Sequence, residues 1–124
     1  MSKVQTGLRY SEEHEWLDTT ATPAKIGVSQ VAADALGDVV YVDLPKVGSS
    51  VTSGSIVGEV ESTKSVGELY APLDGEVVEA NDAVVDAPET INSDPYGDGW
   101  LVKVRVSETP TLMSADEYRA LIGE

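Results

Sequence analysis

Thiol and imidazole groups are scarce in this sequence, which contains no cysteine and a single histidine, His14. Without cysteine there is no disulfide framework, no thiol nucleophile and no zinc site of the cysteine type. One histidine also excludes a metal site built from several histidines. A hydrolytic triad would need a serine and an aspartate to converge on His14, an alternative that we do not favour. Any reactive sulfur would therefore have to belong to a group that is attached to the protein.

Positive charge is scarce as well. The chain has eight lysine and arginine residues against 22 aspartate and glutamate residues, which gives a formal net charge of −14. The phosphates of nucleic acid and the headgroups of anionic lipid would be repelled, so we expect neither nucleic acid nor membrane as a partner. Such a charge suits a protein that must not associate with its own copies while it meets other proteins briefly.

Phenylalanine is absent, and no apolar run approaches the length that spans a membrane. Residues 1–7 lack both the apolar core of a secretory signal and the arginine-rich pattern of a presequence, so we expect a cytoplasmic location. The chain has instead much valine, 11 glycines and a hydrophobic share of 41%. These favour short strands and turns, and the length fits one mainly β domain that covers residues 1–124.

Alternation of apolar and polar residues predicts several strands. They are residues 8–10, 24–28, 38–44 and 100–106. Ser29 is expected to cap a helix of two turns that runs through Leu36, and Gly37 to end it in a left-handed conformation. A second helix is predicted after the capping box that begins at Ser114, because that motif satisfies the free backbone groups of a helix start. This helix should pack on the outside, with three residues on one apolar face: Tyr118, Leu121 and Ile122.

Two parts of the chain look alike. Residues 48–54 place Val51 between two glycine turns, and residues 73–84 repeat a strand, a turn and an inward valine, Val84. Neither part alone could bury both faces of its strands. The glycine-rich first part lacks the Gly-Lys-Ser/Thr ending and the following helix of a phosphate cradle, so no nucleotide site is predicted. Residues 88–92 are predicted as loop.

The next segment, residues 93–99, is dense in turn-forming residues and is predicted to be a tight surface loop. The spacing of Asp94 and Asp98 faintly resembles a calcium-binding loop. However, Tyr96 and Arg105 occupy positions where that loop needs oxygen ligands. We therefore predict no metal site.

The stretch around which the chain is organised is residues 59–72, where Lys64 stands alone among small and acidic residues. Strand-like residues lie on both sides of it, and Pro72 closes the second strand because proline cannot donate to a ladder. Strands this close must fold back as a hairpin. Residues 62–65 are small or hydroxylated, which suits a bend. Lys64 should then stand at the tip, in water.

An exposed lysine in a tight turn is ordinarily a solubilising residue that also blunts a strand edge. Lys64 differs because it is flanked by Glu59, Glu61 and Glu68 and belongs to no basic patch. A catalytic lysine is usually buried, which lowers its pKa, so we predict no catalytic role for this one. Exposure suits a residue that another enzyme must find and acylate.

Several segments match a known family. They are residues 13–16 (EHEW), 35–45, 61–65 (ESTKS), 70–72, 75–81, 92–96 (NSDPY) and 99–100. On these segments, and over nearly its full length, the chain resembles the glycine cleavage H-protein family, lipoyl carriers of the barrel-sandwich hybrid fold. EHEW and NSDPY are the most specific, because biotinyl and other lipoyl domains share the hairpin geometry. The chain departs from the family pattern at three positions. Many members have histidine where this chain has Val31, valine is commoner at the position of Thr63, and serine or alanine is commoner at the position of Gly67.

The resemblance implies a mainly β barrel-sandwich with a short internal helix and a C-terminal helix. It also implies that Lys64 carries lipoate in amide linkage, an arm of roughly 14 Å from Cα to the dithiolane. A lipoate ligase or octanoyltransferase would supply that group. The protein would be a non-catalytic shuttle, and tethering would raise the concentration of the dithiolane at each docked active site.

The implied partners are three enzymes of glycine catabolism. Glycine decarboxylase (P protein) loads an aminomethyl group, and aminomethyltransferase (T protein) passes its carbon to tetrahydrofolate. Dihydrolipoamide dehydrogenase (L protein) then reoxidises the dithiol. The loaded group is a cation that water would decompose, so a carrier has reason to hold it against carboxylates. Our hypothesis is that Glu15 and Glu68 hold this ammonium; the plainer alternative is that both are simply solvated.

Three other readings stay open from the sequence. A biotinyl carrier typically has methionine on both sides of the lysine, where this chain has Thr63 and Ser65. An H-like protein that relays lipoyl groups to other enzymes would have the same modified lysine. An unmodified β interaction module would use Lys64 only for solubility.

Overall fold

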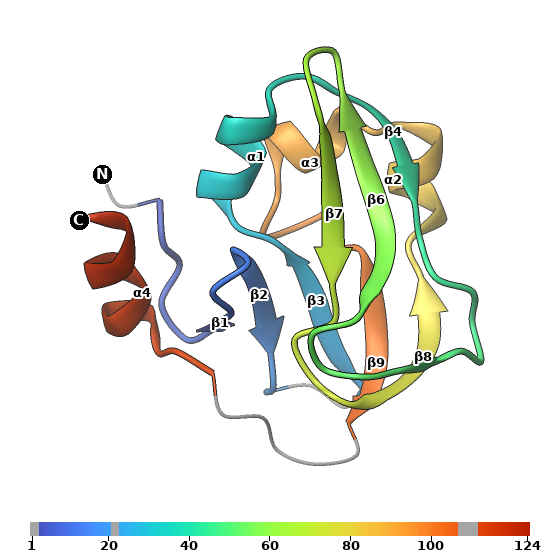
Figure 1. Cartoon of the computed structure of the whole chain (residues 1–124), viewed down its shortest axis with the longest axis horizontal. Coiled ribbons are helices and arrows are strands. Elements are labelled where there is room, and N and C mark those ends of the chain that lie inside the picture. Colours follow the sequence, from blue (N-terminus) through green and yellow to red (C-terminus); the bar gives the residue numbers. More distant parts are fainter. Residues whose placement is uncertain (1–2, 21–22, 107–111) are drawn as a thin grey trace.

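The structure is a computed structural model that describes residues 3–20, 23–106 and 112–124. Two antiparallel sheets pack against each other (Figure 1). The larger sheet has the order β1 (Arg9–Tyr10), β2 (Glu15–Asp18), β3 (Ala24–Val28), β9 (Val102–Val106), β8 (Gly75–Ala80) and β5 (Ser50–Val51). The smaller sheet has the order β4 (Val39–Asp43), β6 (Ile56–Ser62) and β7 (Val66–Tyr70).

The helices are short and lie outside the sheets (Figure 1). They are α1 (Gln30–Leu36), α2 (Asp82–Asp86), α3 (Thr90–Ser93) and α4 (Ala115–Ile122). In the described part of the chain, none of them is long and apolar enough to cross a membrane. The architecture confirms the predicted mainly β fold with a short internal helix and a C-terminal helix, and it adds α2 and α3.

The core lies between the two sheets. Alternate residues of each strand point inward, as the pleat requires, and the six-stranded sheet contributes Ile26, Val77 and Val104 to one apolar cluster. The hairpin of β6 and β7 contributes Val60 and Leu69 to a second cluster. The hairpin is thus held to the body of the protein by its buried inner face and by the pairing of β6 with β4.

The first helix begins as predicted, because the Ser29 side chain accepts a hydrogen bond from the backbone N–H of Ala32. The prediction for its end needs a correction. Gly37 has a φ of 78° but a ψ of −157°, which is not the left-handed helical conformation. The reason is that the chain passes straight from α1 into the extended strand β4.

Two segments predicted as turn and loop are helical. Val84 is fully buried, as predicted, but it belongs to α2, which Asn81 caps by accepting a hydrogen bond from Ala83 N–H. Residues 88–92 include the start of α3, whose N-terminus has no side-chain cap to announce it. The burial of Ile91 in the second cluster stabilises this single turn. Tertiary packing therefore overrode local turn propensity at both places.

The C-terminal helix has both hydrogen bonds of the predicted capping box. Tyr118 is fully buried and stacks on Tyr10, with ring centroids 4.4 Å apart. The prediction of one apolar face was wrong for Leu121, which is 53% exposed. Because α4 contacts the rim of the larger sheet at β1 (Figure 1), only the row through Tyr118 and Ile122, four residues apart, packs inward.

The hydroxyl of Tyr118 ties this helix to the body. It lies 2.7 Å from Nδ1 of His14 and 2.8 Å from Oγ of Ser29. We expect Tyr118→Phe to lower the free energy of unfolding by about 1–2 kcal/mol, because it keeps the stacking but leaves two polar groups without this partner. Urea denaturation followed by circular dichroism measures the change. Tyr41→Phe, at a tyrosine that is 51% exposed, is the control and should change little; equal effects would contradict the prediction.

Candidate functional site

The site begins with the pairing of β6 and β7. The last register pairs before the bend are Glu59 with Glu68, Val60 with Gly67 and Glu61 with Val66. Inner and outer residues alternate along each strand, so Val60 and Leu69 face the core, while the carboxylates and the exposed Val66 lie on the outer face. The chain therefore turns back between residues 62 and 65, as the sequence predicted.

Ser62 organises this bend. Its backbone N–H donates to the carbonyl of Ser65 at 2.8 Å. Its Oγ accepts hydrogen bonds from the N–H groups of Ser65 at 3.0 Å and Lys64 at 3.3 Å. The backbone on both sides of Lys64 is thereby fixed by local bonds, and the side chain is exposed at the tip. It forms no ion pair with any residue that the structure describes.

The end of α1 supports the tip from one side. A Cβ on Gly67 would come within 2.9 Å of Leu36 Cδ2, so the absence of a side chain at position 67 lets this leucine pack against β7. A Cβ on Gly37 would come within 3.1 Å of Lys64 Cε, so the stem of the lysine lies against that glycine. The end of α1 therefore occupies the space that a side chain at position 67 would need.

Carboxylates cross the outer face of the smaller sheet beside the tip. Asp43 is in register with Glu59, and Glu59 with Glu68, so the three stand in one row over three strands. Like charges directly opposite each other destabilise a sheet slightly. The row makes this face strongly negative and gives Glu68, which is exposed, a surrounding that attracts a cation.

Glu15 has the opposite setting, since its side chain is only 3% exposed. Its Oε2 accepts a hydrogen bond from the backbone N–H of Tyr70 at 2.8 Å, and Oε1 lies 3.4 Å from the donating Oγ of Ser11. Burial raises the pKa of Glu15 to about 8, while these two hydrogen bonds pull it down and the nearby charge of Glu13 adds slightly to the rise. At pH 7 most copies therefore carry a neutral Glu15.

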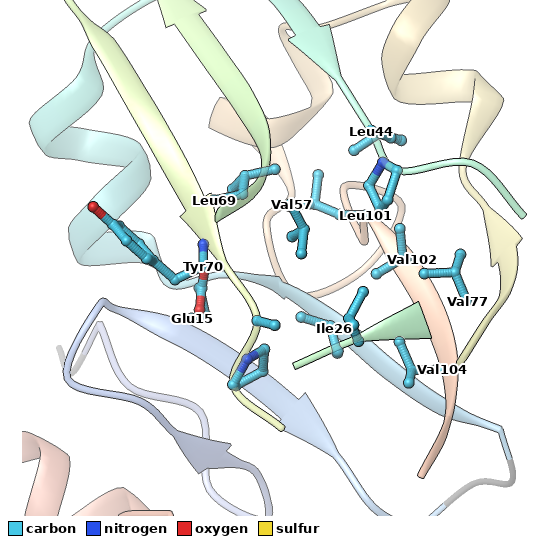
Figure 2. A pocket seen from close by; sticks show the side chains of 14 residues that line it. Glu15, Ile26, Leu44, Val57, Leu69, Tyr70, Val77, Leu101, Val102 and Val104 are labelled. Carbon is cyan, nitrogen blue, oxygen red and sulfur yellow. The ribbon is translucent and has the colours of Figure 1, made fainter. Parts of the chain in front are cut away.

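Glu15 lies in the walls of both an open cleft and a small apolar cavity. The cleft has a volume of about 250 Å³, and its wall includes Glu12, Glu13, Glu15, Ser53 and Tyr70. The cavity, about 30 Å³, lies between the sheets, and Figure 2 shows Glu15 and Tyr70 at one edge of it, with Ile26, Val77 and Val104 farther away. So small an apolar cavity has room for only one or two water molecules, so of these two spaces the cleft is the one that can accept a ligand.

The backbone that presents Glu15 is strained. His14 has a φ of 64°, the single positive value among the described non-glycine residues. Its carbonyl accepts a hydrogen bond from Ser29 N–H at 2.9 Å, and its N–H donates to the carbonyl of Ser11 at 3.1 Å. These two bonds hold the tight loop before β2 in this conformation. The sequence drew attention to this segment through the EHEW match. It gave no sign that Ser11 and a main-chain group of Tyr70 are the partners of Glu15, since a backbone N–H has no sequence signature.

The structure does not bring Glu15 and Glu68 into contact. Glu68 lies four residues past Lys64, about 13 Å along an extended strand, and Tyr70 about 20 Å, at roughly 3.3 Å per residue. An arm of roughly 14 Å anchored at Lys64 therefore reaches Glu68 and ends about 6 Å short of Tyr70, to which the Glu15 carboxyl is hydrogen-bonded. Among the described residues, no group of three potential ligands is arranged to hold a metal ion.

A family model, related sequences and a solved structure all match this chain, and all three belong to the same family. Residues 8–124 match the family model described as glycine cleavage H-protein. The glycine cleavage system H protein of Clavibacter sepedonicus is 59% identical over 120 residues, which cover 97% of this chain and 98% of the relative. That of Streptomyces avermitilis is 58% identical over 118 residues, 94% of each chain. A crystal structure of a glycine cleavage system H protein from Mycobacterium marinum superposes with a TM-score of 0.92 at 45% identity, and covers 98% of this chain and 100% of that one.

The buried carboxyl leads to a prediction about pH. Because the pKa of Glu15 is higher in the native state than the ordinary value of 4.5, the native state binds the extra proton. The free energy of unfolding should then fall as pH rises from about 4.5 to about 8, by at most about 1.4 kcal/mol per pH unit. Glu15→Gln, which mimics the neutral form, should remove this contribution and be the more stable protein at pH 8.

Urea denaturation at several pH values between 5 and 8 measures this difference. Glu68→Gln is the matched control, because Glu68 is exposed and its replacement should leave the wild-type slope in place. A Glu15→Gln protein whose stability changes with pH as the wild type does would refute the assignment.

Proposed function

We propose, from the premise that the chain belongs to the glycine cleavage H-protein family, that Lys64 is the residue to which lipoate is attached. Proteins of this family are carrier subunits of the glycine cleavage system and not catalysts. This chain is accordingly a shuttle protein, whose task is to present one covalently held group to several enzymes. When bound, lipoate supplies the disulfide that takes up the aminomethyl cargo.

The observation that carries the proposal is the placement of Lys64. The lysine is exposed at the end of a hairpin whose bend is fixed by Ser62, and it has no ion pair with a described residue that a modifying enzyme would have to break. In the attachment step, the neutral amine attacks the carbonyl carbon of an activated lipoyl carboxylate. The activating group leaves and the nitrogen loses a proton. A buried amine, or one inside a helix, could not reach a second active site.

The same placement supports the roles of the enzymes that the family implies. The P, T and L proteins must each accept the tip of one hairpin, which projects beyond the body of the protein (Figure 1). We further propose that a lipoate ligase or octanoyltransferase recognises this tip. The strongly negative charge of the chain suppresses contact between its own copies and leaves transient encounters with each enzyme in turn.

We propose that Glu68 and Glu15 hold the ammonium of the cargo in sequence. Glu68 is charged, exposed and within the length of the arm, so it provides the first electrostatic contact. Glu15 lines the cleft farther along β7, about 6 Å beyond that length when it is measured along the extended strand. Because burial favours its neutral form, a cation that enters the cleft would favour the charged form, and its uptake would release a proton.

The attachment site is tested by intact mass. After expression with lipoate and a lipoate ligase, the wild type should gain the mass of one lipoyl group, and Lys64→Arg, which keeps the charge, should gain none. Lys46→Arg is the control, because Lys46 is another exposed lysine in a turn. An unmodified wild type would favour the unmodified interaction module, and a modified Lys64→Arg protein would place the group elsewhere.

The cargo contacts are tested by the lifetime of the loaded carrier. Replacing Glu15 and Glu68 together by glutamine should speed the release of ammonia from the isolated loaded protein by roughly fivefold or more, since each lost charge-assisted hydrogen bond is worth about 1 kcal/mol or more. The control replaces Glu76 and Glu79, which pair with Arg105 and Lys103 on the other sheet. An unchanged lifetime in the variant with both Glu15→Gln and Glu68→Gln would contradict the proposal.

A further inference from the structure

The side chain of Asn92, at the third position of α3, joins the end of α1 to the start of β4. Its Nδ2 donates to the carbonyl of Gly37 at 2.7 Å and lies 3.3 Å from that of Ala33. Its Oδ1 accepts from the backbone N–H of Val39 at 2.9 Å. The last carbonyls of a helix have no partner within the helix, so an amide with two donors and one acceptor matches the groups that this junction leaves free.

The junction held by Asn92 is the part of the body that touches the hairpin tip. The carbonyl of Asp38 accepts a hydrogen bond from Thr63 N–H at 3.1 Å. Gly37 lies against the stem of Lys64, and Leu36 against Gly67. Three successive residues of the junction therefore contact three positions of the tip, one of which is the lysine itself.

We propose that Asn92 is a positioning residue for Lys64, which fixes the place of the hairpin tip through the junction of residues 36–38. The inference rests on the proposed modification of Lys64 and extends it to a residue whose hydrogen bonds are made to Ala33, Gly37 and Val39 and not to the lysine. A reacting amine must be placed closely for attack, and a misplacement of about 1 Å can cost up to 100-fold in rate. Asn92 thereby decides how well the tip fits a modifying enzyme.

The alternative is that Asn92 only stabilises the fold, and Asn81 provides the control for it. The Asn81 amide also makes three hydrogen bonds: it donates to the carbonyls of Asp98 at 2.9 Å and Trp100 at 2.6 Å, and accepts from Ala83 N–H at 3.2 Å. These bonds hold the start of α2 and not the junction at the hairpin tip. Loss of this amide should lower stability comparably and leave Lys64 where it is.

The experiment compares the full-length wild type, Asn92→Ala and Asn81→Ala at a temperature at which circular dichroism finds all three folded. The first measurement is kcat/KM for modification by a lipoate ligase with lipoate and ATP. We expect a fall of roughly fivefold or more for Asn92→Ala and less than about twofold for Asn81→Ala. The second is hydrogen exchange at the Thr63 amide, which should speed up in Asn92→Ala alone. The third is acetylation of Lys64 by a small active ester, which should be the same in all three, because the amine stays exposed.

Each other outcome is decisive. Unchanged kcat/KM and unchanged Thr63 exchange in Asn92→Ala would overturn the inference, as would equal losses in both variants. If the wild type itself is not modified, the proposed attachment fails, and Thr63 exchange still decides whether Asn92 holds the tip. If Asn92→Ala does not fold, Asn92→Asp with Asn81→Asp replaces the pair, because aspartate keeps the acceptor for Val39 and removes only the donors.

Discussion

The pairing of β6 with β7 is the interaction on which the functional arrangement depends. It makes residues 62–65 the bend and Lys64 the outermost residue of that part of the chain. A two-stranded ribbon is only marginally stable in water, so the pairing needs the inner face of the hairpin, where Val60 and Leu69 are buried in the core. The same alternation that buries these residues turns the glutamates outward. Exposure of the lysine and rigidity of its base thus have one physical origin.

The free edge of this hairpin also explains Glu15. The strand β7 is the last of its sheet, so the backbone N–H of Tyr70 needs a partner from elsewhere, and the Glu15 carboxyl provides it. Burial raises the pKa of that carboxyl to about 8 and so favours its neutral form, which suits an edge next to an apolar cavity. One side chain therefore completes the sheet and forms part of the wall of the cleft.

The hairpin tip is supported by the end of α1 at two glycines. Gly67 leaves a space that Leu36 fills, and Gly37 leaves a space along which the lysine stem lies. Asn92 then joins that end of the helix to β4. The effect of a substitution at the tip therefore depends on the residues at the end of α1, since a larger residue on one side requires a smaller one on the other.

Features that depend on near neighbours along the chain could be predicted from the sequence: the alternation of the strands, the serine cap of α1, the capping box of α4 and the bend that carries Lys64. Each is fixed by hydrogen bonds or periodicity within a few residues. The family segments added the hypothesis that Lys64 is the lipoylated residue. Three other features became visible only in the fold: Glu15 is buried, α3 forms and Leu121 faces water. These outcomes depend on which surfaces meet, and residues far apart in the sequence supply the partners, as Tyr70 does for Glu15.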